Sequence, residues 1–567
     1  MKFDLVNEVN RRDELISEKE FYPLLKRLFG DDYFVTSEVR FGSKSIDVVC
    51  VSPEMKQVLA IEMKVSDWRK ALHQALTYQL CADESYVALH RRYCSNIDRS
   101  TFERYGIGLI AIDDYASIEL PAKPSPRISP SYVTALKREV GTRLGVKQST
   151  TLTLRPSPVG FYLWYIPLDK RYFEDFPDYF DGFVINAHIL EHNASAFTAL
   201  ITKLNKSFFA LPDTHAFQFA PLGFFLDSKG GIRTSWEKLA RSYGNLIRMV
   251  LSQGRNVTID DFLSTTGSFE QTVYDLAANV VAFQKRRTVA AAVGLSRFLD
   301  RPSKETAPKK YLVAPYFHFT SLNDPWYKIS LEMTREAVKH KEDYELFAVL
   351  CTSSSVLLSD ALSTIARDYS LPGLDGFLVW IRDFREEDEP VPMLVGLKKL
   401  VRELKSTGKA VINIHGGFFS AALHHCGLDG FACGVCYKDA ADPTEFPTGG
   451  PPGGAVPKYY LAELRIKLPK IDAALALKEL PGLQCSCSVC TGQTQDMFDI
   501  SSPDQLSKEL MNRHFLNVRQ KEMDEVANNT LSAIVKRIEA AYSKYEIRRD
   551  ILRVDHLNRW KEALSEE

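Results

Sequence analysis

Three cysteines and a distant histidine form the tightest group of metal-binding residue types in the sequence. The segment LQCSCSVCTG places Cys485, Cys487 and Cys490 at C-x-C-x-x-C spacing, and His514 follows 24 residues after the third cysteine. Cysteines this close together are poorly placed to form disulfides with one another, whereas their thiolates can share one tetrahedral Zn²⁺ ion. Because four protein ligands leave no open coordination position, the pattern predicts a structural zinc site. Free thiols in a surface loop are the alternative.

A second group combines two acids with a lysine. Asp47 lies in the strand-like segment SIDVV, and after fourteen intervening residues Glu62 and Lys64 lie in AIEMKV. Alternation along a strand places Glu62 and Lys64 on one face, and a neighbouring strand can bring Asp47 beside them. Two carboxylates can bind Mg²⁺ through oxygen, and a lysine ammonium can steer or activate the attacking water in phosphodiester hydrolysis.

Three further residues are expected near this acidic group. Gln74 and Tyr78 are one helical turn apart in HQALTYQ, so both can face the same site. Glu20 opens a predicted helix and could add another ligand. Solvated charges on a strand edge are the simpler alternative for the whole group.

Helical and strand-like segments surround the acidic group in the sequence, and they predict an α/β domain over residues 1–120. EKEFYPLLKRLFG and DWRKALHQALTYQLCAD have helical spacing, and the strand-like segments are FVTSEVRFG, SIDVVCVS, VLAIEMKV and YGIGLIAID. The segment PAKPSPRISPS that follows is rich in proline and serine, so residues 121–154 are predicted to be a linker.

Residues 155–480 show eight short apolar runs that alternate with helical patterns, as expected for a (β/α)8 barrel. The runs are VGFYLWYIP, DGFVINAHIL, FFALPDTHAFQF, KYLVAPYFHF, ELFAVLCTS, DGFLVWIRDF, KAVINIHGG and DGFACGVCY. About 90 residues of mostly helical pattern, roughly 222–308, separate the third and fourth runs and predict a helical insertion. Residues 481–567 are predicted to hold the zinc site and C-terminal helices.

Composition sets outer limits on function. The chain has 567 residues with 71 Lys plus Arg against 72 Asp plus Glu, so net charge gives no sign of nucleic-acid binding. No apolar run approaches 18 residues and the first twenty residues are highly charged, so we expect neither a membrane span nor a signal peptide, and a cytoplasmic location. The ten cysteines fit reduced thiols and one metal site better than a disulfide framework.

The acidic group resembles the active site of the PD-(D/E)XK nuclease superfamily. Asp47, Glu62 and Lys64 match its acid and E-x-K pattern, and Gln74 and Tyr78 match the Q-x-x-x-Y helix of its exonuclease-like branches. The resemblance covers residues 15–115 in the expected order of elements. It implies a restriction-endonuclease-like fold and either an Mg²⁺-dependent nuclease, with Asp47 and Glu62 as metal ligands, or an inactive DNA-binding module.

The cysteine–histidine pattern after an eight-stranded barrel resembles the zinc site of the tRNA-guanine transglycosylase family. In that family the third strand ends in D-S-G-G-F-Q, and the third run here reads PDTHAFQF, so Asp213, Phe217 and Gln218 match. The family's covalent aspartate lies on the eighth strand, where this chain has Ala432 in LDGFACGVC. A methyl group cannot attack an anomeric carbon, so the resemblance implies a changed reaction.

In such a barrel the active site lies at the carboxyl ends of the strands. The polar residues expected there, besides Arg382 and Lys438, are catalytic candidates Asp213, Asp383, His415 and Asp439. Candidates for contacting an extruded base are Asn186, His188, Phe217, Gln218, Tyr316 and His318, with Phe317 and Trp380 as further aromatic candidates. For each residue taken singly, a structural role is the alternative.

These patterns together predict a DNA base N-glycosylase. Asp213 could orient water or stabilise an oxocarbenium-like sugar, which would release a modified base and leave an abasic site for the N-terminal domain to bind or cut. Anti-phage defence is predicted by analogy with glycosylases that remove hypermodified cytosines from invading DNA. DNA is the expected partner rather than tRNA, and the transglycosylase resemblance implies a homodimer.

Three alternatives remain open. The first is a transglycosylase that inserts a deazaguanine into DNA or tRNA, with Asp383 or Asp439 as nucleophile. The second is a metal-dependent DNA nuclease whose barrel only recognises modified bases. The third is a non-catalytic nucleic-acid-binding subunit of a larger complex.

Overall fold

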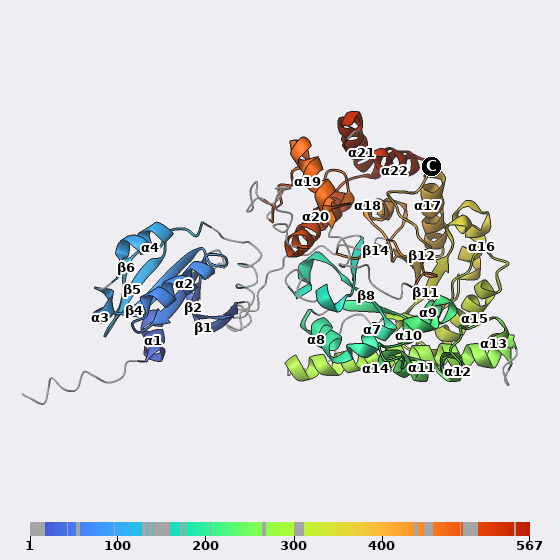
Figure 1. The fold of residues 1–567 in the computed structure, drawn as a ribbon, viewed down its shortest axis with the longest axis horizontal. Coiled ribbons are helices and arrows are strands. Elements are labelled where there is room, and N and C mark those ends of the chain that lie inside the picture. Colours follow the sequence, from blue (N-terminus) through green and yellow to red (C-terminus); the bar gives the residue numbers. More distant parts are fainter. Residues whose placement is uncertain are drawn as a thin grey trace, which may run out of the picture. The chain divides into compact units, whose positions relative to one another are not determined.

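The chain divides into two compact units, residues 1–154 and 155–567, which are described separately below (Figure 1). The computed structural model describes residues 17–41, 44–52, 57–95, 97–126, 133, 136, 140, 159–169, 173–174, 177–204, 206–263, 268–299, 311–435, 440–446, 458–487, 489–490, 508–548 and 551–566.

The first unit is built on one six-stranded mixed sheet. Its strands follow the order of the chain, and β3, β4 and β5 are parallel while the remaining neighbours are antiparallel. The strands are β1 (Phe34–Phe41), β2 (Lys44–Val51), β3 (Val58–Lys64), β4 (Glu84–His90), β5 (Gly108–Ile112) and β6 (Ala116–Leu120). Strands β4 and β6 were not predicted from the sequence.

Helices cover both faces of this sheet. The unit's helices are η1 (Glu18–Glu20), α1 (Phe21–Phe29), α2 (Trp68–Tyr78), α3 (Arg91–Cys94) and α4 (Arg99–Tyr105). Phe21 and Leu25 of α1 pack with Ile61 on one face. On the other face Ala71 of α2 and Phe102 of α4 pack with strands β4 and β5. Side chains of β3 therefore alternate between two separate cores.

The second unit is a parallel eight-stranded barrel, in which β14 pairs with β7. Seven of the strands lie inside the predicted apolar runs and β9 begins one residue before its run, which confirms the predicted barrel strands. They are β7 (Gly160–Trp164), β8 (Gly182–Asn186), β9 (Ser207–Leu211), β10 (Tyr311–Val313), β11 (Glu345–Thr352), β12 (Gly376–Ile381), β13 (Ala410–Asn413) and β14 (Gly430–Cys433).

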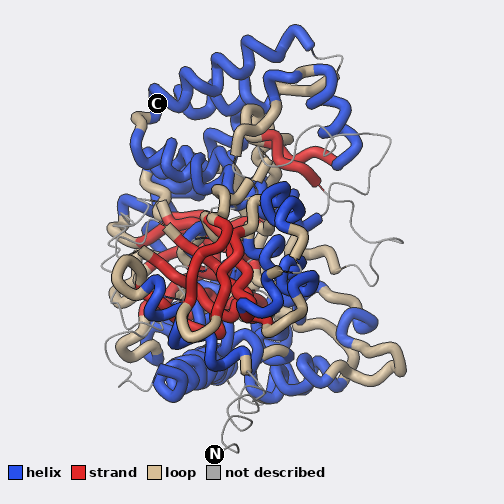
Figure 2. Tube along the Cα trace, turned by 90° about the vertical axis from the view of Figure 1, so that its left-hand side faces the viewer, coloured by secondary structure: helices blue, strands red, loops and turns tan. Residues whose placement is uncertain are grey.

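Figure 2 colours the described helices of the whole chain blue and the strands red. In the second unit, helices surround the barrel strands and bury their outer side chains. They are α7 (Ala187–His192), α8 (Ala194–Leu204), α15 (Pro325–His340), α16 (Ala361–Asp368), α17 (Val391–Ser406) and α18 (Phe418–Ala422). The inner side chains form a separate buried cluster that includes Trp164, Phe209, Trp380 and Ala432. The barrel interior is therefore packed with side chains and forms no open channel through its middle.

The helical insertion begins earlier than predicted. It comprises α9 (Thr214–Phe219), α10 (Leu222–Phe225), α11 (Thr234–Tyr243), α12 (Asn245–Ser252), α13 (Asp260–Leu263) and α14 (Phe269–Leu299). The segment THAFQF, taken as the end of the third strand, is thus helical. Its aromatic residue Phe217 packs with Phe225 and Trp236 in a core belonging to the insertion, which favours a helix over continued strand.

The barrel has one seam, between β9 and β10, where the described strands share no ladder pairing. Phe209 and Tyr311 stack across it at 4.5 Å. Along β10 and the segment that follows it, side-chain amides and one hydroxyl form hydrogen bonds with the backbone in place of the missing ladder bonds. Gln284 bonds both backbone groups of Val313, at 2.7 and 2.8 Å. Three side chains from the insertion bond the backbone in this way: Gln284 at Val313, Thr214 at Tyr316 and Gln218 at His318.

In the described residues after the barrel, the main elements are a hairpin and four α-helices. They are β15 (Lys458–Leu461), β16 (Ile466–Pro469), α19 (Lys470–Glu479), α20 (Lys508–Asn528), α21 (Leu531–Tyr545) and α22 (Asp555–Ser565). Trp560 of α22 donates to the carbonyl of Glu386 at 2.7 Å, and Lys398 of α17 donates to Ala563 at 2.8 Å, so the last helix packs against the barrel. Among the described helices, none is long and apolar enough to cross a bilayer.

A buried acid lies beneath this last helix. The Glu386 carboxylate accepts hydrogen bonds from the backbone N–H groups of Phe419 at 3.0 Å and Ser420 at 3.1 Å, and from the Ser420 hydroxyl. Burial raises the pKa of Glu386 to about 7 from its usual value of 4.5, although these hydrogen bonds act to lower it.

This acid predicts a pH dependence of stability. Because the folded-state pKa exceeds the unfolded one, the folded chain holds an extra proton between these values, and the stability it contributes is lost as pH rises through about 7. The effect is on the order of 3 kcal/mol. The free energy of unfolding is measured by urea titration at several pH values from 5 to 8. Glu386→Gln should lose the contribution of Glu386 to the slope of this free energy against pH, whereas the neighbouring control Glu387→Gln should keep it. Equal slopes for both variants and the wild type would contradict the assignment.

Candidate functional sites

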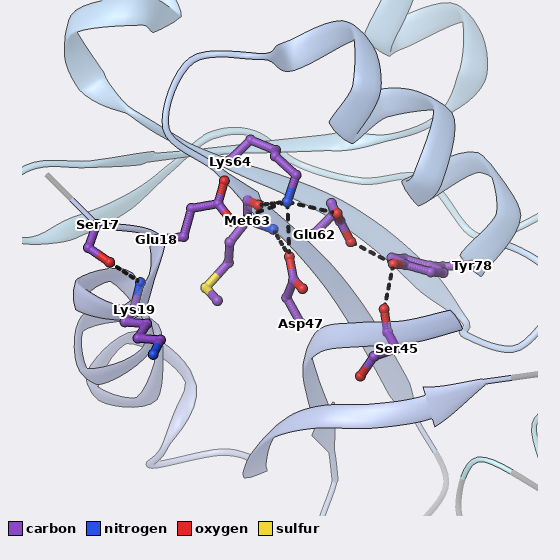
Figure 3. Close-up of polar contacts among 9 residues, drawn as sticks. All are labelled: Ser17, Glu18, Lys19, Ser45, Asp47, Glu62, Met63, Lys64 and Tyr78. Carbon is purple, nitrogen blue, oxygen red and sulfur yellow. Dashed lines mark hydrogen bonds and ion pairs between the residues drawn. The ribbon is translucent and has the colours of Figure 1, made fainter. Parts of the chain in front are cut away.

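The acidic group of the first unit converges on the ammonium of Lys64 (Figure 3). Lys64 Nζ lies 3.2 Å from Glu62 Oε1, 3.7 Å from Asp47 Oδ2 and 3.3 Å from Glu18 Oε2. Glu62 and Lys64 share one face of β3, and the antiparallel partner β2 brings Asp47 beside them. Burial lowers the pKa of Lys64, but the neighbouring carboxylates outweigh it, so the pKa lies above its usual value. These carboxylates are therefore arranged around a positive charge.

Glu62 is the most buried member of the group, with 1% of its side chain exposed. Tyr78 of α2 donates a hydrogen bond to Glu62 Oε2 at 2.5 Å and is also 3.2 Å from the Ser45 carbonyl. Burial raises the pKa of Glu62 and Asp47 adds to this, while Tyr78 and Lys64 act to lower it. A cation beside Glu62 would stabilise the charged carboxylate in this low-dielectric position.

Asp47 is anchored differently from Glu62. Its Oδ2 accepts the backbone N–H of Met63 at 2.8 Å, and about a quarter of its side chain is exposed. Burial raises the pKa of Asp47, whereas the Met63 N–H and Lys64 lower it. Asp47 is thus the more accessible of the two carboxylates predicted to bind metal.

A glutamate two residues before the predicted Glu20 contacts the cluster. Glu18, not Glu20, reaches Lys64, because η1 turns the side chain two residues earlier toward the cluster while Glu20 is exposed before α1. Gln74 lies one turn before Tyr78 on α2, and its buried Oε1 has no hydrogen-bond partner among the described residues. The amide oxygen of Gln74 is therefore available as an acceptor.

The cysteine–histidine group is assembled as a four-ligand cluster. The ligand atoms of Cys485, Cys487, Cys490 and His514 all lie within 4.8 Å of one another, and this set could bind a metal ion such as zinc. His514 Nδ1 is 3.2 Å from Cys490 Sγ and 3.5 Å from Cys487 Sγ. Sulfur and nitrogen donors at these separations match the edges of a small tetrahedron, which suits zinc chemistry.

Neighbouring groups orient the histidine ligand. His514 Nε2 is 2.7 Å from the carbonyl of Tyr460, so it donates there and leaves Nδ1 as the metal-facing atom. Tyr459 stacks on the His514 ring at 4.4 Å. Both tyrosines belong to β15, while His514 belongs to α20, so the cluster joins the hairpin, the cysteine loop and a long helix.

At the carboxyl rim of the barrel, the buried Asp213 pairs with the partly exposed His188. Asp213 follows β9, and His188 lies in the first turn of α7, after β8. Asp213 Oδ2 accepts the backbone N–H of His188 at 2.8 Å and lies 2.7 Å from His188 Nδ1. The side chain of Asp213 is 1% exposed and that of His188 is 21% exposed. The parallel neighbours β8 and β9 bring together two candidates that are 25 residues apart.

The aromatic candidates for base stacking are occupied within the protein. Tyr316, Phe317 and Phe217 are each no more than 2% exposed. The Tyr316 hydroxyl is 3.0 Å from His215 Nδ1, and Phe317 packs against Trp326. Trp380 is also buried and donates to the carbonyl of Ala441 at 2.9 Å. The interpretation of these rings as open stacking surfaces is wrong, because the insertion and the barrel core cover them.

Gln218 and His318 also have internal roles. The Gln218 amide bonds the His318 backbone at 3.0 and 2.9 Å, so it helps to close the seam and does not face a ligand. The His318 side chain is buried, with Nε2 3.3 Å from the Ser353 hydroxyl. Burial lowers its pKa to about 4.

The other rim candidates lie in different environments. Asn186 ends β8 and is partly exposed. Asp383 follows β12 with 62% of its side chain exposed, 3.7 Å from Arg385, and His415 is buried and stacked on Trp164 at 4.9 Å. Asp383 is therefore accessible to solvent, whereas His415 is enclosed by the barrel core. Lys438 and Asp439 lie outside the described residues.

Position 432 carries no reactive group. Ala432 lies on β14 and belongs to the buried inner cluster with Trp164 and Trp380. Arg382, at the end of β12, instead pairs with Asp442 at 2.8 Å. The described rim thus offers Asp213 and His188 as its one carboxylate–imidazole pair at hydrogen-bond distance.

Two residues of the rim were missed in the sequence. Trp236 stacks on His188 at 4.4 Å with 15° between the rings. Burial raises the pKa of Tyr243, and the nearby Asp213 carboxylate adds to the shift. Both lie on α11, seven residues apart and therefore on one helix face. That spacing is a detectable signal, but nothing local in the sequence connects α11 with Asp213.

Comparisons with known proteins give no assignment. No family model and no curated protein matches the chain. A protein of unknown function from Silicibacter pomeroyi is 18% identical, with a TM-score of 0.20, over 23% of this chain and 88% of that chain. An intracellular xylanase from Thermoanaerobacterium saccharolyticum is 9% identical, with a TM-score of 0.29, over 51% and 94%. Xylanase B from Clostridium stercorarium is 9% identical, with a TM-score of 0.26, over 48% and 85%. Similarities at this level identify neither family nor activity.

Proposed function

We propose that the barrel hydrolyses the N-glycosidic bond of a modified base in DNA and leaves an abasic site. The observation that carries this proposal is the Asp213–His188 pair at the carboxyl rim, where active sites of such barrels lie. A carboxylate beside an imidazole can guide a water proton and stabilise positive charge that develops on the sugar. Ala432 supports hydrolysis over base exchange, because an alanine at the position of the family's covalent aspartate cannot act as a nucleophile.

The test is release of free base from defined DNA. Duplexes carrying 5-hydroxymethylcytosine, its glucosylated form or a 7-deazaguanine are incubated with the purified chain, with mass spectrometry for free base and an aldehyde-reactive probe for abasic sites. Asp213→Asn should reduce release by about 10²–10⁴-fold. Glu62→Gln, a matched loss of one carboxylate in the other unit, should release base normally.

Other outcomes would favour the alternatives. Incorporation of labelled deazaguanine would favour the transglycosylase alternative, with the accessible Asp383 as a nucleophile candidate. Strand cleavage without base release, unaffected by Asp213→Asn, would make the chain a nuclease whose barrel only recognises its target. Binding of DNA without any reaction would indicate a non-catalytic subunit.

We propose a second activity for the first unit, namely metal-dependent cleavage of DNA at or near the abasic site, by a restriction-endonuclease-like domain. The supporting observation is that Asp47, Glu62 and Glu18 surround one cation, the Lys64 ammonium. If Lys64 swings outward, Asp47 and Glu62 would hold Mg²⁺, which supplies Lewis-acid stabilisation of a phosphodiester. Lys64 would then steer the attacking water.

We further propose that the Cys485, Cys487, Cys490 and His514 cluster holds structural zinc, since four protein donors close the coordination sphere. None of the described cysteines is joined in a disulfide, which fits a reducing compartment such as the cytoplasm. A role in defence against phages with modified DNA would follow from base excision. Plaque counts on a host expressing wild type or Asp213→Asn, with phages of modified and unmodified DNA, test that role.

A further inference from the structure

We propose that His188 is the residue of the barrel site that exchanges protons with the reactants, and that Asp213 acts through His188 as its positioning residue. This inference rests on the proposed base-excision function and assigns the roles within it. The transglycosylase resemblance pointed to Asp213 as the acting carboxylate. However, only 1% of the Asp213 side chain is exposed, against 21% for His188, so a substrate can reach the imidazole and not the carboxylate.

The hydrogen bonds of His188 determine which of its two ring nitrogens can accept a proton. Asp213 Oδ2 lies 2.7 Å from Nδ1 and also accepts the His188 backbone N–H at 2.8 Å. An ionised carboxylate can only accept, so Nδ1 carries a proton and Nε2 keeps its lone pair in the neutral ring. Nε2 is therefore the atom that can take a proton from water, with Asp213 stabilising the imidazolium that results.

The helical insertion fixes the plane of this ring. Trp236 of α11 stacks on His188 at 4.4 Å, with 15° between the ring planes, and Trp236 itself is 1% exposed. The Asp213 carboxylate holds the ring at one edge while the indole covers one face. Two restraints from different elements leave the imidazole little rotational freedom, which is the condition for efficient proton transfer.

The other histidines near the rim are unsuited to this role. His215 and His318 are 4% and 3% exposed, and burial lowers the pKa of each to about 4, so both are neutral at pH 7. His215 is already bound to the Tyr316 hydroxyl. Other titratable groups near the pair are Tyr243 on α11, which is influenced by Asp213 and Glu191, and Glu191 itself, which pairs with Arg287 of α14.

The reaction balances with water as the only co-reactant. The water oxygen forms a bond to the anomeric carbon of the nucleotide and gives one proton to His188 Nε2. The bond from that carbon to the base nitrogen breaks, and its electron pair leaves with the base. His188 then passes the proton to the departing base, which restores the neutral imidazole.

The test compares His188→Ala and Asp213→Ala in the full-length protein, with base release from the same modified duplexes measured as kcat and KM. His188→Ala should lower kcat by about 10²–10⁴-fold with little change in KM. Added imidazole should restore part of the activity of His188→Ala but none of that of Asp213→Ala. The pH profile of Asp213→Asn should be displaced relative to wild type, because the imidazolium loses its partner. His192→Ala, which removes an exposed histidine of the same helix, is the matched control.

The outcomes separate the two proposals. If His188→Ala releases base at the wild-type rate while Asp213→Ala is inactive, Asp213 acts directly and this inference is wrong, but base excision stands. If wild type releases no base from any duplex, base excision fails and the inference fails with it. Thermal melting of each variant shows whether a loss of activity reflects unfolding. If His188→Ala is unfolded, the deciding measurement is whether added imidazole restores activity to His188→Gln.

Discussion

Removing metal from the cysteine–histidine cluster is expected to unfold the segments that follow the barrel. The cluster joins the β15 hairpin, the cysteine loop and α20, and these segments share one buried core. The hairpin is also joined to α20 through Glu522, which accepts from Tyr460 and pairs with Arg465. Structural zinc contributes about 10–16 kcal/mol of apparent binding free energy at pH 7. That is as large as the roughly 5–15 kcal/mol by which a whole domain is stable, so the apo form should not keep this region folded.

The measurement is metal content per chain, followed by thermal melting and limited proteolysis with and without a zinc chelator. One zinc per chain and rapid proteolysis after chelation are expected, with the first cuts between the barrel and α20. Cys487→Ser should reproduce the effect without chelator, whereas Cys426→Ser, a buried cysteine outside the cluster, should retain the metal. A metal-free chain that melts as wild type does would refute the zinc site.

Glu62→Gln is expected to abolish strand cleavage by the first unit while leaving its fold intact. The substitution keeps an oxygen acceptor for the Tyr78 hydroxyl but removes the charge needed to bind Mg²⁺. Loss of metal-based stabilisation worth several kcal/mol corresponds to about 10²–10⁴-fold in rate. Because burial raises the pKa of Glu62, its ionised form is costly in the folded chain, and the neutral variant should be at least as stable.

Cleavage of DNA containing abasic sites, with Mg²⁺ or with chelator, provides the measurement. Lys64→Ala should also lose activity, while Glu84→Gln, a carboxylate of β4 bonded to Tyr86, should not. Cleavage by Glu62→Gln at the wild-type rate would exclude the carboxylate site. Retained DNA binding with no cleavage in wild type would instead identify the unit as a binding module.

Local patterns in the sequence were sufficient for the eight barrel strands and for the cysteine–histidine cluster that could bind a metal ion. The eight apolar runs match the eight barrel strands because each buried strand needs its own short hydrophobic segment. Cys485, Cys487 and Cys490 are close in sequence, so their spacing alone restricts them to one centre. Glu62 and Lys64 are two residues apart on a strand, and alternation fixes their common face.

What the sequence could not supply depends on contacts between distant segments. The pairing of His188 with Asp213 arises from the parallel neighbours β8 and β9, and the stacking of Trp236 arises from how the insertion folds back. Glu18 contacts Lys64 in place of the predicted Glu20 because of a single short turn, whose direction is set by tertiary packing. Gln218 matched a base-binding motif, yet its amide is used by a backbone segment 100 residues away.

The seam between β9 and β10 is more sensitive to mutation than the other strand junctions of the barrel. A ladder of backbone hydrogen bonds is nearly immune to mutation, because every residue except proline carries the same N–H and C=O groups. Here closure passes instead through Thr214, Gln218 and Gln284, whose side chains bond the backbone of the neighbouring segment. Closure of the barrel at this junction therefore depends on side chains that single substitutions can replace. Point mutations can loosen or tighten it, and a lineage can tune the opening of the barrel wall beside Asp213 without disturbing the other seven strand junctions.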